Sequence, residues 1–495
     1  MKRYAGVLLH PTSLPGGFCN GELGTDAYRY IDFLHASGFT IWQTLPLGPT
    51  HGNRSPYQSI SVHAGNPLLI STQWLVDKGW LNAAEQAMGN QPEGHQARVN
   101  ERRILLGIAY RNFLKKASKK AHQDFHDFVN QQSFWLDDYA MFLALDMEFG
   151  SSHWNQWPEK YRKRDAKALA NVQSRFPERI ESIHFEQFLF FTQWLELKAY
   201  ANSKNVLLLG DMPIFVAHDS ADVWASQENF RLDVSGNPSV VAGVPPDYFS
   251  AVGQRWGNPH YDWQTMKASD YGWWKHRLRT QLDLFDIVRI DHFRGFEAFW
   301  EIPADCPTAI GGAWVPGPGA DFFYKLQQSF GSNLPLIAED LGVITQEVDQ
   351  LRDQFDLPGM KVLQFAFDDG ATNPYLPHNH IENAVVYTGT HDNDTSLGWY
   401  LSLDEKRQQY VNYYLDCQPE QMPWPLIRCA LASVAKYAMI PMQDILALDS
   451  SHRMNIPGTT ENNWQWRFQW PQLEGQLSER LHELISLYGR ADGST

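Results

Sequence analysis

The chain has 495 residues, of which 43% are hydrophobic, and it carries a formal net charge of −15 at pH 7. This length allows a large buried core, and the excess of acidic residues argues against a protein that binds nucleic acid through its phosphates. The apolar runs are too short for a signal peptide or for a membrane span of about 18 residues, so we expect no membrane partner.

Eight short apolar runs, each ending in polar residues, glycine or proline, predict β-strands. In chain order they cover residues 5–9, 40–45, 206–212, 287–291, 336–339, 361–367, 384–389 and 440–446. Helical periodicity lies between most of them, for example at 26–37 and 346–355. Strands that alternate with helices predict a parallel sheet, and eight such units predict an α/β fold of the (β/α)8, TIM-barrel type.

Two connections between the predicted strands are unusually long. About 160 residues separate the second strand from the third, and about 75 separate the third from the fourth. We therefore expect a single catalytic barrel domain over 1–495 with insertions at about 50–203 and about 213–285. Insertions after strands emerge on the C-terminal rim, where the active sites of barrels lie, and these would form walls or a lid.

The two insertions differ in their patterns. The first is predicted to be mainly helical, with amphipathic segments at 97–118, 133–150 and 183–203. The second contains residues 242–263, which are dense in glycine, proline and aromatic residues and predict a structured loop.

Cysteine usage suggests an intracellular protein. The four cysteines, Cys19, Cys306, Cys417 and Cys429, show no metal-ligand spacing and are too few for a disulfide framework. We therefore expect reduced thiols and a cytoplasmic location.

Three carboxylates each follow a strand-like run. Asp291 ends DIVRID, Glu339 follows LIA, and Asp392 follows VVYTGTH. Because parallel strands of a barrel end at one rim, these groups can converge there. Cleavage of a glycosidic bond with retention uses such a set, with one carboxylate as nucleophile and one carboxylic acid as proton donor.

The neighbours of the three carboxylates suggest separate roles. Arg289 lies two residues before Asp291, on the same side of the strand, and a guanidinium there favours the ionised form that a nucleophile needs. Glu339 leaves a buried strand, and partial burial raises the pKa of a glutamic acid so that it keeps its proton. Asp392, beside His391, can hold sugar hydroxyls and balance the positive charge of the transition state.

Each residue taken alone has a simpler explanation. An aspartate after a strand is often a helix N-cap or part of a surface ion pair. The pair His391–Asp392 can also belong to a metal site. Asp211 lies at the end of another predicted strand, and we expect it to have a structural or hydrogen-bonding role. Asp340 is expected to point away from Glu339 and to be structural.

Long strings of this sequence resemble the 4-α-glucanotransferases called amylomaltase or disproportionating enzyme, relatives of the α-amylases. They include LLHPTSLPGG, GDMPIFVAHDSADVW, GVPPDYFSAVGQRWGNPHYDW, VRIDHFRGF, YTGTHDNDT and RMNIPGTTENNWQWR, and they run nearly from end to end. The PPDYFS-x-x-GQRWGNP string is typical of this family, whereas Arg-x-Asp with a later Glu is shared with the wider amylase group.

The resemblance implies a role for each candidate residue. Asp291 matches the nucleophile, Glu339 the acid/base and Asp392 the transition-state stabiliser. The candidate substrate-binding residues are Tyr57, Asp211, Tyr248, Phe249, Gln254, Trp256, Arg289, His292, His391 and Asn463.

The expected reaction is the transfer of α-1,4-glucan segments to the 4-hydroxyl of glucose or of another glucan, without a cofactor or metal. The partners expected are therefore maltooligosaccharides, amylose and glucose. A plain α-glucan hydrolase remains an alternative, because its first half-reaction is identical. A further alternative is a glucan-binding protein whose barrel has lost its catalytic activity. Such a protein is expected to lack at least one of the three carboxylates or Arg289, and this chain has them all.

Overall fold

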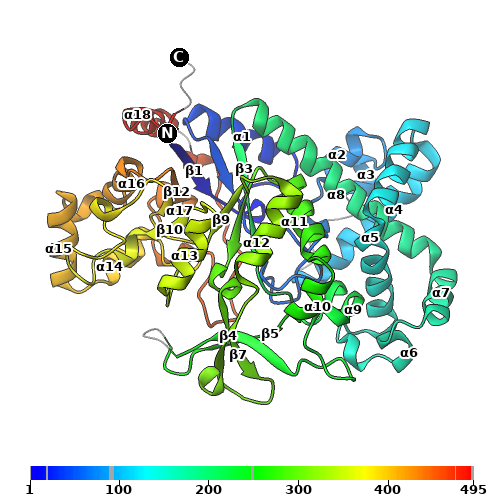
Figure 1. The fold of residues 1–495 in the computed structure, drawn as a ribbon. Coiled ribbons are helices and arrows are strands. Elements are labelled where there is room, and N and C mark those ends of the chain that lie inside the picture. Colours follow the sequence, from blue (N-terminus) through cyan, green and yellow to red (C-terminus); the bar gives the residue numbers. More distant parts are fainter. Residues whose placement is uncertain (1, 18–19, 88–93, 247–249, 474, 492–495) are drawn as a thin grey trace.

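A parallel eight-stranded sheet forms the centre of the molecule (Figure 1). The computed structural model describes residues 2–17, 20–87, 94–246, 250–473 and 475–491. The strand order is β10-β11-β12-β1-β2-β3-β6-β9, and the Ala338 N–H donates to the Pro358 carbonyl at 2.9 Å where the two edge strands meet. The sheet is therefore a nearly closed barrel, as predicted. The strands are β1 (Tyr4–Leu8), β2 (Ile41–Gln43), β3 (Leu207–Pro213), β6 (Ile287–Asp291), β9 (Leu336–Ala338), β10 (Gly359–Val362), β11 (Ala384–Tyr387) and β12 (Tyr437–Pro441).

All eight predicted strands are present, with bounds that differ by one or two residues for most of them, and two strands end five residues earlier than predicted. The sixth was predicted at 361–367, whereas β10 ends at Val362 and a 3-10 helix (Leu363–Phe365) follows. The eighth was predicted at 440–446, whereas β12 ends at Pro441 and the short helix α17 (Met442–Ile445) follows. Both errors have one cause: a buried helical turn is as apolar as a buried strand, and a short run does not distinguish them.

Successive side chains of each barrel strand point alternately into the barrel interior and outward to the surrounding helices. The interior cluster takes one or two side chains from most strands: Ile41, Leu209, Ile287, Ile337, Met360, Val362, Val385, Tyr387, Tyr437 and Met439. Because side chains alternate between faces, Arg289 and Asp291 follow Ile287 on the interior side of β6. The strand thus carries its polar residues directly to the C-terminal rim.

Helices surround the barrel and pack on its outer face (Figure 1). They are α1 (Thr25–Ala36), α8 (Pro177–Ser203), α11 (Gly272–Leu284), α12 (Gly319–Phe330), α13 (Gln346–Gln354), α14 (Ser396–Ser402), α15 (Glu405–Leu415), α16 (Trp424–Ala432) and α18 (Leu477–Leu487). The predicted helices at 26–37 and 346–355 correspond to α1 and α13.

The long connection between β2 and β3 is mainly helical, as predicted. Its helices are α2 (Thr72–Asp77), α3 (Ala83–Ala87), α4 (His95–Lys116), α5 (Lys119–Phe149), α6 (Glu159–Arg162), α7 (Ala166–Arg175) and α8. Helix α5 begins 14 residues before the predicted position 133, because the Ser118 side chain accepts a hydrogen bond from the Ala121 N–H and caps it there.

A second, antiparallel sheet lies at the lower edge of Figure 1, with the order β5-β4-β7-β8. Its strands are β4 (Val240–Val244), β5 (Gln254–Pro259), β7 (Ala298–Pro303) and β8 (Ala313–Pro316), and α9 (Ala221–Ala225) and α10 (Trp263–Ala268) flank β4 and β5. The prediction of a loop over 242–263 is wrong for these two strands. Strand β4 pairs with the nearby β5 and also with β7, which comes after the barrel strand β6, so the local sequence carries no sign of this second partner.

Within the described part of the chain, no helix has the length and apolar character to cross a membrane. Cys306, Cys417 and Cys429 are not in disulfide bonds in this structure. Cys19 lies outside the described residues.

Candidate active site

Arg289 is held between two carboxylates at the C-terminal rim of the barrel. Strands β3 and β6 pair so that Asp211 lies opposite Arg289. The guanidinium donates to both oxygens of Asp211 at 2.7 and 2.8 Å and lies 3.0 Å from an oxygen of Asp291. The Tyr57 hydroxyl also donates to Asp211, at 2.6 Å. Only 6% of the Arg289 side chain is exposed, so its charge acts with little screening by water.

Asp291 is the only member of this group whose carboxylate is substantially open to the cleft, with 30% of its side chain exposed. Desolvation raises its pKa to about 6, although Arg289 acts in the opposite direction. The expectation that Arg289 keeps Asp291 in the ionised form is therefore only partly met. Arg289 shares its charge with Asp211, and the negative charges of Asp211 and Asp392 act against a second anion nearby.

Glu339 follows β9 and is almost completely buried. One carboxylate oxygen accepts the His292 N–H at 2.6 Å and the other accepts the Leu341 N–H at 2.9 Å. His292 adopts a left-handed backbone conformation (φ 56°) immediately after β6, where the chain turns into a 3-10 helix (Phe293–Phe296). Burial raises the pKa of Glu339 to about 7, against the lowering effect of Arg289 and the two N–H donors. The predicted direction of this shift is confirmed.

Asp340 points to the opposite side of the strand end, as predicted. Its carboxylate pairs with Arg352 and accepts the Met360 N–H at 2.6 Å, so it links β9 to α13 and β10. Asp340 is therefore a structural residue.

Asp392 and His391 lie in the loop after β11. The His391 Nε2 is 3.3 Å from one oxygen of Asp392, and the Asn455 side-chain amide donates to the other at 2.6 Å. About half of the Asp392 side chain is exposed, and the partial loss of water around it favours its protonated form, but His391 and Asn455 outweigh this effect and lower the pKa of Asp392 to about 2. Burial also opposes the charged form of His391, yet Asp392 raises the pKa of the imidazole overall. Among the described residues, no group of three metal-ligating side chains accompanies this pair.

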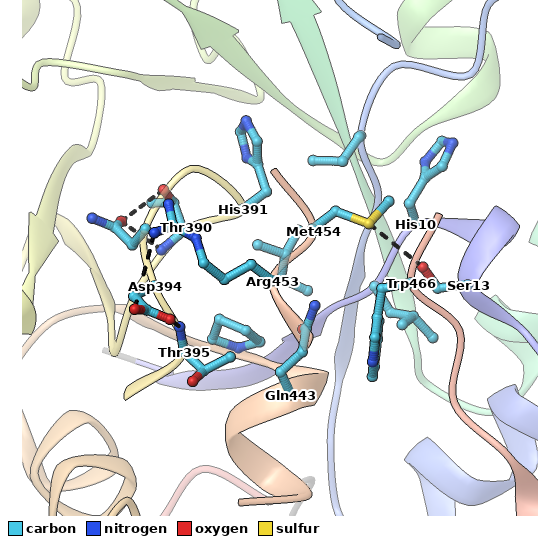
Figure 2. A pocket seen from close by; sticks show the side chains of 15 residues that line it. His10, Ser13, Thr390, His391, Asp394, Thr395, Gln443, Arg453, Met454 and Trp466 are labelled. Atoms are coloured by element: carbon cyan, nitrogen blue, oxygen red, sulfur yellow. Dashed lines mark hydrogen bonds and ion pairs between the residues drawn. The ribbon is translucent and has the colours of Figure 1, made fainter. Parts of the chain in front are cut away.

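Asn455 and Arg453 hold this loop and were not predicted as site residues. Arg453 donates to the Asp392 carbonyl at 2.9 Å, and its guanidinium lies 3.9 Å from Asp394. Figure 2 shows Arg453 extending toward Asp394 beside Thr390 and His391. Both residues come from the segment after β12, about 60 residues from Asp392 in the sequence. Only the string RMNIPGTTENNWQWR could have indicated them.

Aromatic rings line the opposite sides of the site. His391 stacks on Tyr57 (ring centroids 5.0 Å apart, interplanar angle 16°), with Trp464 at 5.9 Å. Trp256 meets His292 edge-on at 5.0 Å. Burial, followed by the nearby positive charges, lowers the pKa of His292 to about 3, and its Nε2 has no hydrogen-bond partner among the described residues. His292 thus has a neutral ring with a buried nitrogen that lacks a hydrogen-bond partner, next to the Trp256 indole.

The remaining candidates lie in different surroundings. Gln254 is exposed and accepts the Trp256 indole N–H at 3.1 Å. Asn463 is buried: its carbonyl accepts the Ile456 N–H at 3.0 Å and its amide donates to the Thr459 carbonyl at 3.0 Å. In this structure Asn463 therefore shapes the 456–463 loop. Tyr248 and Phe249 lie outside the described residues.

Comparison with known proteins identifies the family. The family model described as 4-alpha-glucanotransferase matches residues 9–473. The chain belongs to this family. It is 49% identical to a 4-alpha-glucanotransferase of Thermus thermophilus over 98% of each chain, and 48% identical to one of Synechocystis over 99% of this chain and 98% of the relative. An amylomaltase of Streptococcus agalactiae, solved in complex with acarbose, superposes with a TM-score of 0.94 at 38% identity, over 99% of this chain and 100% of that one.

The 4-alpha-glucanotransferase family membership confirms the resemblance found in the sequence, and the superposition confirms the barrel with large helical insertions. The activity is that of a 4-alpha-glucanotransferase on α-1,4-glucans. The site described above is where the chemistry of such a transfer is expected, at the C-terminal rim of the barrel.

Proposed function

We propose that the transfer proceeds by retaining double displacement, with Asp291 as nucleophile, Glu339 as acid/base and Asp392 as transition-state stabiliser. The observation that carries this assignment is the position of Arg289: its guanidinium lies 3.0 Å from a carboxylate oxygen of Asp291, whereas Glu339 is buried and accepts hydrogen bonds from the backbone N–H groups of His292 and Leu341. When one carboxyl of the pair ionises, Asp291 loses its proton first because it lies beside Arg289. This is the state that glycoside cleavage requires, with one carboxylate and one carboxylic acid.

In the first half-reaction, Glu339 gives its proton to the glycosidic oxygen while the Asp291 carboxylate attacks the anomeric carbon. The bond from that carbon to the oxygen breaks, the reducing-end segment leaves, and a glycosyl ester on Asp291 remains. In the second half-reaction, the Glu339 carboxylate takes the proton of an acceptor 4-hydroxyl, whose oxygen displaces Asp291. The bond formed is of the same type as the bond broken, so the cycle needs no external energy source. Asp392, ionised throughout, balances the charge of the oxocarbenium-like transition state.

We propose glucose and maltooligosaccharides as acceptors and longer α-1,4-glucans as donors. The relative from Streptococcus agalactiae was solved with acarbose, which supports a ligand site within the shared fold. A cytoplasmic location stays a prediction, supported by the free thiols.

Transfer is expected to follow a bell-shaped pH profile with its maximum between about pH 6 and pH 7. Activity falls as the pH drops below about 6 because Asp291 must be ionised, and it falls above about 7 because Glu339 must be protonated. The measurement is kcat/KM for maltotriose from about pH 4 to pH 9, with circular dichroism at each pH as a control for folding. A constant rate across this range contradicts the assignment of the two carboxyls.

Trp256 is proposed to help exclude water from the glycosyl ester, because its ring packs against Phe215 and against His292, the residue that follows Asp291 in the chain. Trp256→Ala is expected to raise the ratio of hydrolysis to transfer several-fold, whereas Trp256→Phe, which keeps a ring, changes it little. The assay incubates each protein with maltotriose and follows chain lengths and new reducing ends. A ladder of longer glucans together with glucose supports transfer, and shortening alone in the unmodified enzyme identifies a hydrolase. An unchanged ratio in Trp256→Ala excludes this role of the indole.

A further inference from the structure

A large groove lies on the outer face of the barrel, between α16 and α18 and beside the end of α15. Its volume is about 1080 Å³, slightly above the usual range for small-molecule sites. None of its lining residues belongs to the site around Asp291 and Glu339. Figure 1 shows α15, α16 and α18 together on the side of the barrel away from the insertion helices α4 to α7. The groove is therefore a feature separate from the catalytic rim.

Two arginines in this groove lie over aromatic rings. The Arg480 guanidinium is 3.5 Å from the centroid of Trp424, and the Arg428 guanidinium is 5.7 Å from that of Tyr488. Cation–π contact of this kind holds a guanidinium in place and leaves its N–H groups free to donate. Neither guanidinium has an ion-pair or hydrogen-bond partner elsewhere in the described chain. The guanidinium N–H groups of Arg428 and Arg480 are therefore held in position and are available to donate hydrogen bonds to a ligand in the groove.

The charge of the lining distinguishes between classes of ligand. The groove is lined by three carboxylates (Asp416, Glu420 and Glu483) and two guanidinium groups, so its formal net charge is −1. That balance disfavours phosphates and other anions. A neutral ligand with many hydroxyls can both donate to carboxylates and accept from guanidinium groups.

Apolar side chains supply the remaining contact area. Leu484 and Leu487 of α18 line the groove together with Ala432 and Pro425 of α16, and Leu487 is 64% exposed. A sugar ring has apolar C–H patches on its faces and hydroxyls at its edge, so such a surface complements it. An exposed apolar surface of this kind, rimmed by polar residues, marks a binding site.

We propose that this groove is a second binding site for α-1,4-glucan chains, which anchors long substrates at a distance from the catalytic rim. The proposal rests on the glucan transfer described above. A chain that is held at the groove raises the local concentration of its free end, so the effect is restricted to glucans long enough to occupy both places.

The test compares amylose with maltotriose. Trp424→Ala and, separately, Arg480→Ala are expected to raise KM for amylose by about tenfold, the change that about 1.4 kcal/mol of lost contact produces. The kcat and the kinetics with maltotriose stay unchanged. Tyr413→Ala is the matched control, because Tyr413 is an aromatic residue of α15 that is 89% exposed and lies outside the groove lining. Using two variants separates a folding defect from a binding defect.

Direct binding is measured by electrophoresis in gels that contain amylose, in an Asp291→Asn background that prevents turnover. Retardation that is lost with Trp424→Ala but kept with Tyr413→Ala supports the groove. Equal behaviour of both variants overturns it, as does a change in sedimentation without a change in amylose binding, which indicates an interface between copies of the chain. Failure of the proposed transfer itself is recognised separately, by the absence of a product ladder from maltotriose in the unmodified enzyme.

Discussion

Asp291→Asn is expected to reduce transfer from maltotriose by at least about 10⁴-fold, because the amide cannot form the glycosyl ester. The reduction is expected in kcat with little change in substrate binding, since the rest of the rim is retained. Thermal unfolding is expected to be unchanged or slightly raised near pH 7. The raised pKa of Asp291 means that its charge is unfavourable in the folded state, and the neutral amide removes this cost.

Glu339→Gln separates the two catalytic roles when it is tested with an activated donor. The variant is expected to lose transfer from maltotriose to a similar extent, because the leaving oxygen is no longer protonated. With α-maltosyl fluoride, whose leaving group needs no proton, release of fluoride is expected to recover in Glu339→Gln and to stay absent in Asp291→Asn. Recovery in Asp291→Asn instead contradicts the assignment of the nucleophile. Asp340→Asn is not suited as a control, since Asp340 holds Arg352 and β10 in place.

Arg289→Leu is expected to lower the free energy of unfolding by about 3–5 kcal/mol near neutral pH, because it leaves the buried carboxylate of Asp211 and the partly exposed carboxylate of Asp291 without their shared cation. The pKa of Asp291 then rises further, so transfer near neutral pH is also expected to be lost. Protonation of Asp291, whose pKa is already raised to about 6, relieves its repulsion with Asp211, and the destabilisation is therefore smaller at pH 5 than at pH 8. Chemical denaturation at these two values tests both the size and the direction of the effect.

The matched control for this prediction removes the opposing charge as well. In Arg289→Leu combined with Asp211→Asn, one of the two unpaired carboxylates is gone, and part of the lost stability is expected to return. Transfer is not expected to return, because Asp291 still lacks its cation. If Arg289→Leu alone is as stable as the unmodified protein at pH 8, the guanidinium is not the element that holds the rim together.

The sequence by itself was sufficient for the barrel and for the three carboxylates. Each barrel strand is a contiguous apolar run with its own end signals, and parallel strands must end at one rim, so Asp291, Glu339 and Asp392 could be placed together without coordinates. The direction in which Glu339 and Asp340 point followed from alternation alone. The exceptions were short apolar runs such as 440–446, where strand and helix share one pattern.

Other features depend on contacts between distant segments, and here only the tertiary structure was decisive. Strand β4 finds its partner β7 beyond a complete barrel strand, and Asn455 reaches Asp392 from the end of the next one. The raised pKa values of the catalytic pair are also a tertiary property. The sequence showed Arg289 beside Asp291, but the structure shows that Asp211 takes both hydrogen bonds of one guanidinium nitrogen and that desolvation raises the pKa of Asp291. A local pattern gives the neighbours of a charge along the chain, whereas its pKa depends on every charge and every excluded water around it in three dimensions.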